Sequence, residues 1–270
     1  YVTNGVHHYT WVNNSIKTLF NEFLPNWQME PEILRGVDKI DTNALWDAHF
    51  DAKTDLIHFA NSQLSKALDP NILTIGFARR AATYKRAQLI FKDPERLISL
   101  GAGKIQMVFS GKAHPNDKEG KELISGIIKN AKDFEGKIKI IYLENYNMWL
   151  GKLITSGVDV WLNTPLRPNE ASGTSGMKAA LNGIPNLSIL DGWWDEGCEN
   201  KVNGWSIGLS ERPDDQGDAI SLYDTLEHQV IPAYYNEREN WVSLMRNSIK
   251  TGVDFTSKRM LQDYQKLYYK

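Results

Sequence analysis

From Asn71 to about Leu209, short β-rich runs alternate with helix-forming stretches, and this alternation constrains the fold more than any other feature of the chain. Strands are expected at 72–77, 105–109, 137–143, 158–162, 186–190 and 205–209. Helices are expected between them at 83–92, 117–132, 146–155 and 174–181. Apolar strands joined by helical crossovers are typical of a parallel sheet covered on both faces. The sequence therefore predicts an α/β fold with a doubly wound parallel sheet.

Helical patterns precede and follow this alternating region. Residues 11 to about 68 predict helices, one of which is capped by Asp41-Thr42-Asn43 and ends before Pro70. Amphipathic stretches at 219–235 and 239–249 predict further helices, and a last helix is expected to end at Lys270. Because no repeat or linker interrupts the chain, we expect one domain over 1–270. It comprises a helical lead-in (1–70), the parallel core (71–210) and C-terminal helices (211–270).

Composition excludes several classes of protein. The 270 residues carry a formal net charge of −2, which argues against a nucleic-acid or anionic-membrane partner. A single cysteine, Cys198, excludes an internal disulfide and suits a reducing cytosol. No apolar run approaches the length of a membrane span, and no signal peptide is visible. We therefore expect a cytoplasmic protein.

One segment between an expected strand and an expected helix combines an acid, glycines and a lysine: Glu170-Ala171-Ser172-Gly173-Thr174-Ser175-Gly176-Met177-Lys178. A glycine-rich turn that opens a helix leaves main-chain N–H groups unpaired near the positive end of the helix dipole, which suits an anion. Lys178 follows one turn later, where its amine can reach a ligand at the helix start. A plain strand-to-helix turn with a surface lysine is the simpler interpretation, but this order of residues favours a binding site.

Other polar motifs follow the remaining strands. Ser110-Gly111-Lys112 follows the second strand and Glu144-Asn145-Tyr146 the third. After the first strand come four cations: Arg79, Arg80, Lys85 and Arg86. Because the carboxyl ends of parallel strands meet at one edge of a sheet, we expect these motifs to line one crevice. The density of positive charge indicates an anionic ligand such as phosphate, with a solvated helix start as the alternative.

The 170–178 segment closely resembles the cofactor-lysine segment of the α-glucan phosphorylases (glycogen, starch and maltodextrin phosphorylases). The resemblance extends from Thr3-Asn4-Gly5 to about Leu209 and includes four further motifs: Tyr84-Lys85-Arg86, Ser110-Gly111-Lys112-Ala113, Leu143-Glu144-Asn145-Tyr146 and Leu181-Asn182-Gly183. It implies a Rossmann-like C-terminal lobe of a two-lobed, GT-B-type glycosyltransferase whose N-terminal lobe is absent from this chain. Ser175-Gly176 and Asn147 depart from the long eukaryotic enzymes and resemble the shorter bacterial and archaeal branch.

The resemblance also implies a role for each matching residue. Lys178 corresponds to the lysine that carries pyridoxal 5′-phosphate as a Schiff base, and with Arg80 and Lys85, which match the ligands of inorganic phosphate, it makes up the expected catalytic set. Further cofactor contacts are expected from Thr174, Ser175, Gly176, Arg79, Tyr146 and Trp11. Sugar contacts are expected from Glu170, Ser172, Gly173, Tyr84 and Asn4.

The reaction implied by the resemblance is reversible phosphorolysis, in which α-1,4-glucan and inorganic phosphate give a shortened glucan and α-glucose 1-phosphate. In the family, the cofactor's 5′-phosphate relays a proton to the substrate phosphate. The active site lies between two lobes, so this chain alone is expected to lack phosphorolytic activity. The missing lobe is the expected partner, and homo-oligomer formation stays open.

Three other functions remain to be weighed. A retaining glycosyltransferase that uses a nucleotide sugar commonly carries a second glutamate eight residues after the first, but this chain has Lys178 at that spacing from Glu170. A non-catalytic module that binds sugar or phosphate is the second alternative. The third, a metal site built on His7, His8 and His114, lacks the ligand spacing of known metal motifs, and no metal is expected.

Overall fold

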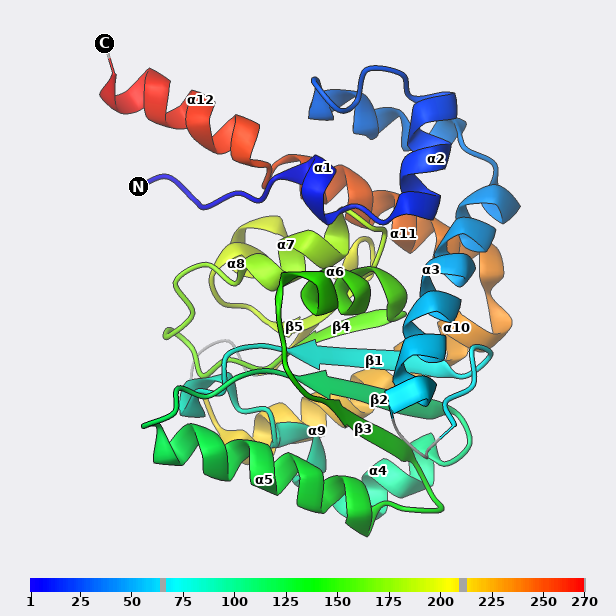
Figure 1. Ribbon diagram of the computed structural model, residues 1–270, viewed down its shortest axis with the longest axis vertical. Coiled ribbons are helices and arrows are strands. Elements are labelled where there is room, and N and C mark those ends of the chain that lie inside the picture. Colours follow the sequence, from blue (N-terminus) through cyan, green and yellow to red (C-terminus); the bar gives the residue numbers. More distant parts are fainter. Residues whose placement is uncertain (64–66, 209–212, 270) are drawn as a thin grey trace.

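The computed structural model describes residues 1–63, 67–208 and 213–269. Within them, six parallel strands form one sheet in the order β3-β2-β1-β4-β5-β6 (Figure 1). The strands are β1 (Leu73–Ala78), β2 (Ile105–Ser110), β3 (Lys139–Leu143), β4 (Val160–Asn163), β5 (Asn186–Ile189) and β6 (Gly204–Ile207). The predicted doubly wound parallel sheet is therefore confirmed, with strand ends shifted by one or two residues.

The strand order reverses direction at β1, which pairs with β2 on one side and β4 on the other. Chain crossovers leave this point in opposite directions, so the loops after β1 and β4 diverge and leave a crevice between them. The segment 79–86 follows β1, and the segment 164–178 follows β4. The topology thus brings the two segments expected to bind a ligand to the same crevice.

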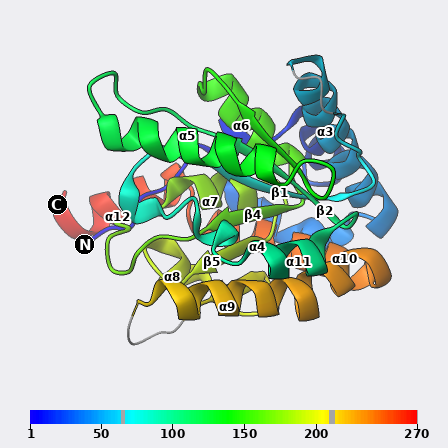
Figure 2. The same cartoon turned by 90° about the horizontal axis from the view of Figure 1, so that it is seen from below.

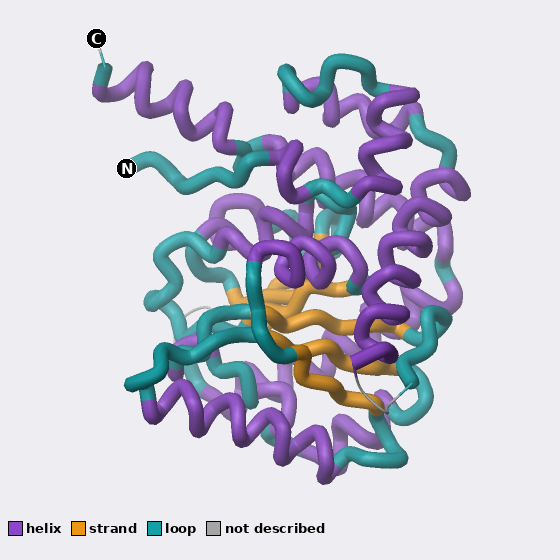
Figure 3. The backbone as a smooth tube through the Cα atoms, in the orientation of Figure 1, coloured by secondary structure: helices purple, strands orange, loops and turns teal. Residues whose placement is uncertain are grey.

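Helices cover both faces of the sheet. One face carries α6 (Met148–Gly157) and α7 (Thr174–Ala180), and the opposite face carries α4 (Pro94–Gly101), α5 (Lys118–Asp133) and α9 (Asp215–Thr225) (Figures 1 and 2). The strands consequently lie enclosed between two helical layers (Figure 3). Every residue of β1, β2, β4 and β5 is buried, so these strands do not alternate between buried and exposed residues.

The flanking regions are helical, as expected. The lead-in contains α1 (His8–Trp11), α2 (Asn14–Phe23), the 3₁₀ helix η1 (Pro31–Lys39) and α3 (Thr42–Gln63). Asp41 caps α3 as predicted, because its Oδ1 accepts hydrogen bonds from the backbone N–H groups of Asn43 (2.8 Å) and Ala44 (3.2 Å). The C-terminal part contains the π-helical turn η4 (Leu226–Val230), α10 (Ile231–Asn236), α11 (Arg238–Val253) and α12 (Ser257–Tyr268).

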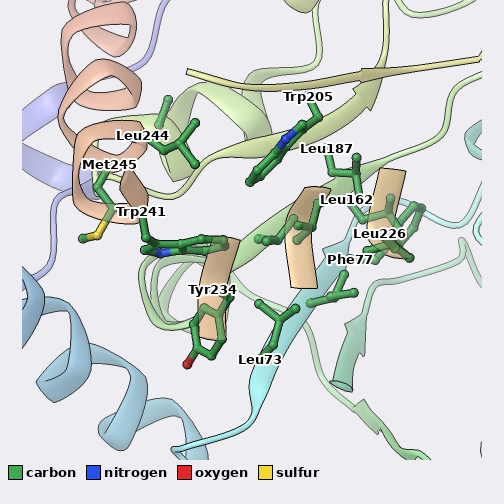
Figure 4. Close-up of a cluster of buried hydrophobic side chains, with 14 of the residues drawn as sticks. Leu73, Phe77, Leu162, Leu187, Trp205, Leu226, Tyr234, Trp241, Leu244 and Met245 are labelled. Atoms are coloured by element: carbon green, nitrogen blue, oxygen red, sulfur yellow. The ribbon is translucent and has the colours of Figure 1, made fainter. Parts of the chain in front are cut away.

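The apolar core on the α9 side of the sheet joins the strands to the C-terminal helices (Figure 4). Leu162 and Leu187 project from β4 and β5 toward Trp205, Tyr234 and Trp241, all of which are buried. Trp241 lies 5.0 Å from Tyr234, ring centroid to centroid, at an edge-on angle of 84°. This packing fixes α10 and α11 against the sheet.

A buried polar cluster ties α3 to the start of β4. Asp159 accepts hydrogen bonds from the Nζ of Lys53 (2.6 Å), the Nε2 of His49 (2.9 Å) and the backbone N–H of Thr74 (2.7 Å). Lys53 also donates to the hydroxyl of Tyr234 (2.8 Å). Burial alone raises the pKa of Asp159, but the charge of Lys53 and the contact with His49 outweigh it and leave that pKa below its usual value.

The prediction of a helix over 83–92 is wrong. Two 3₁₀ turns, η2 (Thr83–Lys85) and η3 (Leu89–Phe91), stand there, and Arg86 between them is left-handed at φ 46°. Helix propensity is a weak preference that tertiary contacts override. Here the hydroxyl of Thr164 bonds the carbonyls of Lys85 and Arg86, each at 3.0 Å, and so holds the turn.

Two short helices, α4 and α8 (Trp193–Gly197), were not anticipated. The expected ends of two other elements, Leu209 and Lys270, lie outside the described residues, as do residues 64–66, which follow α3. In the part of the chain that the structure describes, no helix combines the length and apolar character that crossing a membrane requires.

Candidate active site

A cleft of about 340 Å³ opens at the carboxyl ends of β1 and β4, where the strand order reverses. Its walls come from the segment after β1, the segment after β4 and Tyr146, two residues before α6. The lining residues include Arg79, Arg80, Tyr84, Lys85, Tyr146, Glu170, Ser172, Gly173, Thr174, Ser175 and Lys178. Eleven of the fourteen residues that the sequence singled out thus line a single cleft.

Three of the expected residues do not line it. Asn4 lies on the N-terminal segment, where its carbonyl accepts a hydrogen bond from Arg259 (3.2 Å). Gly176 is buried beneath the cleft, where an added Cβ would lie 2.5 Å from the Oδ1 of Asn186. Trp11 does not line the cleft, but its ring lies against the amine of Lys178. A direct ligand contact from Asn4 is therefore not supported by this geometry.

The segment after β1 reaches the cleft by passing close to Gly111. Arg79 donates its backbone N–H to Ser110 (3.2 Å), and Ala81 donates to the carbonyl of Lys112 (3.0 Å). A Cβ at position 111 would lie 2.2 Å from the carbonyl oxygen of Arg79, so only glycine fits there. The glycine of the Ser110-Gly111-Lys112 motif therefore shapes the cleft rather than contacting its contents.

Glu170 is the electrostatic centre of the cleft. One of its oxygens, Oε2, accepts hydrogen bonds from both Arg79 and Lys85, and the side chain is 8% exposed. Burial acts to raise the pKa of Glu170, but the charges of Arg79 and Lys85 outweigh it, so the pKa lies below its usual value. The carboxylate is therefore ionised at neutral pH and holds both cations at the cleft floor.

Asp191 supports Glu170 from behind. Its Oδ2 accepts a hydrogen bond from the backbone N–H of Glu170 (2.9 Å) and so fixes the backbone from which the Glu170 side chain extends. Burial and the nearby charge of Glu170 raise the pKa of Asp191. Nothing in the sequence marked this contact, because the two residues lie 21 positions apart in a region without regular spacing.

Lys178 presents an amine without an ionic partner. Its Nζ lies 3.6 Å from the centroid of the Trp11 ring, and within the described residues it makes no hydrogen bond or ion pair. Burial lowers the pKa of Lys178. A lysine whose ammonium form is disfavoured in this way is a better nucleophile toward a carbonyl group. Gly173, left-handed at φ 83°, precedes the first residue of α7, and Lys178 lies on that helix and lines the cleft.

Several polar atoms of the cleft are buried but unsatisfied among the described residues: Arg79 Nη1, Ser172 Oγ and Ser175 Oγ. Buried polar groups in native proteins are nearly always hydrogen-bonded, so unpaired donors gathered at one place indicate a ligand. Arg80 adds a further cation at the mouth of the cleft, where it is exposed. The set of donors is suited to oxyanions.

Arg86 does not belong to this cationic group. Its guanidinium turns away from the cleft and pairs with Asp215 (2.9 Å) and Asp218 (2.7 Å) of α9. The expectation of four cations around an anion is therefore corrected to three, Arg79, Arg80 and Lys85. The two partners are more than 120 positions from Arg86 in the sequence, which is why spacing alone gave no sign of them.

The three histidines considered for a metal site have other surroundings. His7 bonds Thr10 (2.7 Å), His8 bonds the carbonyl of Gln28 (2.9 Å), and His114 accepts from the backbone N–H of Asn116 (3.2 Å). Over residues 1–63, 67–208 and 213–269, no three His, Cys, Asp or Glu side chains gather in a way that could hold a metal ion.

Comparison with known proteins matches residues 1–197 to the phosphorylase family, described as carbohydrate phosphorylase. Over 99% of its length the chain is 42% identical to a maltodextrin phosphorylase of Thermococcus litoralis. It is 40% identical over its whole length to a glycogen phosphorylase of Aquifex aeolicus and 38% identical over 99% to one of Mycobacterium tuberculosis. The chain spans 35% to 43% of the length of these relatives.

Proposed function

Since this chain belongs to the carbohydrate phosphorylase family, we propose that it forms the C-terminal, cofactor-binding lobe of an α-glucan phosphorylase. The observation that carries the proposal is that the amine of Lys178 lies in the same cleft as several buried donors, and that neither it nor they have partners among the described residues. A binding module for sugar alone has no use for such an amine. The reaction proposed is the reversible phosphorolysis of α-1,4-glucan to α-glucose 1-phosphate.

The donor set fits pyridoxal 5′-phosphate. The aldehyde of this cofactor matches the Lys178 amine, whose pKa is lowered, and its phosphate matches the unsatisfied Nη1 of Arg79 and Oγ of Ser175. Thr174 and Gly176 complete the proposed cofactor site, with Tyr146 and Trp11 as aromatic walls. When bound, the cofactor supplies a phosphate that exchanges protons with the substrate phosphate.

The remaining cleft residues act on the substrates. Arg80 and Lys85 bind inorganic phosphate and stabilise negative charge next to the sugar as its glycosidic bond breaks. The Glu170 carboxylate accepts hydrogen bonds from sugar hydroxyl groups, and Ser172 and Gly173 donate to them. Tyr84 adds a contact to the sugar. Lys178 anchors the cofactor and transfers no proton in this scheme.

We also propose that the cleft is completed by an N-terminal lobe, because the related enzymes are more than twice as long as this chain. On that basis the 270-residue chain folds as one cofactor-binding domain but lacks phosphorolytic activity by itself. The net charge of −2 and the single cysteine support a cytoplasmic enzyme with no nucleic-acid partner.

Reduction with borohydride in the presence of pyridoxal 5′-phosphate, followed by peptide mass analysis, tests the cofactor site. The label is expected on Lys178 in the wild-type chain and is expected to disappear in Lys178→Ala. Lys152→Ala is the matched control, because burial lowers the pKa of Lys152 too, although Lys152 does not line the cleft. A label on Lys152 or another lysine in place of Lys178 contradicts the proposal.

The full-length enzyme tests the reaction itself. Lys178→Ala should abolish phosphorolysis, whereas Arg80→Ala should mainly raise the KM for phosphate. Turnover by a Lys178→Ala enzyme at a rate near that of the wild type would exclude the assigned role of this lysine.

A further inference from the structure

Arg86 adopts a conformation that its residue type disfavours. It is 9% exposed and lies in the left-handed region at φ 46°, ψ 45°, where a side chain with a Cβ is strained. Strained backbone of this kind persists only where the surrounding structure holds it in place, and it gathers at functional sites. The contacts of Arg86 therefore indicate which function its left-handed conformation serves.

Within the described residues, the guanidinium of Arg86 donates four hydrogen bonds to partners on two segments. Its Nε donates to the carbonyl of Thr164 (2.9 Å) and its Nη2 to the carbonyl of Pro165 (2.9 Å). Nη1 pairs with Asp215 (2.9 Å), which is 53% exposed, and Nη2 with Asp218 (2.7 Å), which is 2% exposed. One side chain thus joins the turn at 83–86 to the segment after β4 and to α9.

The backbone of the same turn is held at three consecutive carbonyls. The hydroxyl of Thr164 is 3.0 Å from the carbonyl oxygens of both Lys85 and Arg86, and the backbone N–H of Leu166 donates to the carbonyl of Tyr84 (2.7 Å). The segment after β4 therefore fixes the backbone of Lys85, while the Lys85 side chain extends over the Tyr84 ring to Glu170 in the cleft.

We propose that Arg86 is a positioning residue for Lys85, and that its clamp on α9 and on the segment after β4 sets where the Lys85 ammonium stands in the phosphate site. A lysine has a flexible four-carbon side chain, so its charge is well placed only if its Cα is fixed. The left-handed turn at Arg86 sends two neighbouring cations in opposite directions, one into the cleft and one toward α9. The inference rests on the proposed function for the identity of the ligand.

A purely structural role for Arg86, holding α9 on the domain, predicts a different outcome. Arg96 offers the matched control, because it joins α4 to the same helix α9 through Asp224 and Glu227 and does not line the cleft. If Arg86 only attaches α9, then Arg86→Gln and Arg96→Gln should each differ from the wild type in stability alone. A positioning role predicts a defect specific to phosphate.

Steady-state kinetics of the full-length enzyme test the inference first. Arg86→Gln is expected to raise the KM for inorganic phosphate by up to about a hundred-fold, the loss that a misplacement of about 1 Å can cause, and to change the KM for glucan far less. Thr164→Val, which keeps the shape of the side chain and removes only its hydroxyl, should show the same pattern more weakly. Arg96→Gln should leave both KM values unchanged. An equal rise of both KM values in Arg86→Gln, or the same rise in Arg96→Gln, overturns the inference.

The reactivity of the Lys85 amine gives a readout independent of phosphate. Trace acetylation with acetic anhydride, followed by peptide mass analysis of the 270-residue chain, should show Lys85 reacting several-fold faster in Arg86→Gln and Thr164→Val than in the wild type. Lys137, an exposed residue for which the described residues show no contact with Arg86 or its partners, serves as the internal reference. An unchanged rate at Lys85 in both variants overturns the clamp. If the wild-type enzyme does not use phosphate at all, the proposed function fails, while this measurement still decides the clamp.

Discussion

Replacing Glu170 with glutamine should make the cleft bind inorganic phosphate more tightly. The carboxylate of Glu170 accepts hydrogen bonds from Arg79 and Lys85 on the same oxygen and so occupies cations that a phosphate would otherwise use. A phosphate that binds there must displace it. Glutamine has nearly the same shape but carries no charge, so it competes less for both cations.

The contacts set the size of the effect. Two hydrogen bonds between charged groups are worth at least about 1.5 kcal/mol each, hence about 3 kcal/mol together. A neutral amide oxygen retains roughly half of this, because hydrogen bonds with ionised partners are about twice as strong as neutral ones. Phosphate binding therefore gains about 1.5 kcal/mol in the variant, which corresponds to an affinity about tenfold higher.

Thermal unfolding of the 270-residue chain, with and without inorganic phosphate, measures this effect. Without phosphate, loss of about 1.5 kcal/mol of stability lowers the Tm of Glu170→Gln by about 3–6 °C. Saturating phosphate should restore most of this loss, because a tenfold lower Kd adds about 1.4 kcal/mol of stabilisation. Titration calorimetry gives the Kd directly.

Glu144→Gln is the matched control, since it removes one negative charge from an exposed residue near Tyr146, and among the described residues Glu144 pairs with no cation. It should leave the Tm and the affinity for phosphate almost unchanged. Phosphate that binds Glu170→Gln no more tightly than it binds the wild type would refute the competition inferred from the geometry.

Two further predictions concern stability. Lys53→Met should destabilise the chain by about 3–5 kcal/mol in urea denaturation, because it leaves the buried Asp159 carboxylate without its ionic partner, and adding Asp159→Leu should recover much of the loss. Folding lowers the pKa of Asp159, so the stabilisation from its ionised carboxylate is complete above the unfolded pKa of about 3.9 and declines as the pH falls through the folded pKa. Below about pH 4 the wild type should therefore lose more stability than Asp159→Asn. Equal losses of stability in the two proteins would contradict the pairing. Gly176→Ala should destabilise by about 1–3 kcal/mol, since its methyl group would lie 2.5 Å from Asn186 and 2.7 Å from Trp193, and an unchanged midpoint of unfolding would show that the site can relax.

The sheet could be predicted because its cause is local. Strands such as β1 and β2 are buried on both faces and are therefore mostly apolar, so they stand out as short runs between polar segments. The cleft between the segments after β1 and β4 followed from topology, since the carboxyl ends of parallel strands share one edge. The expectation that the motifs after β2 and β3 line it too was wrong for Ser110-Gly111-Lys112 and for Glu144-Asn145. The segment 170–178 could be assigned because acid, glycines and lysine occur together in one continuous run of chain.

Pairing between charges could not be predicted in this way. Four cations close together in sequence suggested one anion site, yet Arg86 serves α9 and Arg79 and Lys85 share Glu170. The helix expected over 83–92 failed for the same reason, because contacts with Thr164 and Asp218 outweigh a difference in local propensity of well under about 1 kcal/mol per residue.

The amino-acid sequence by itself determined the six strands and their order along the chain, most of the helices, the family, and the segment 170–178 that lines the cleft. Only the tertiary structure decided which carboxylate neutralises which cation, that Arg86 faces away from the cleft, and that Asn4 lies outside it. The physical reason is the separation in sequence over which each effect acts. Periodicity and propensity act over a few residues, whereas the partner of a buried charge is set by whatever the folded chain brings within about 3–4 Å, at any separation in sequence.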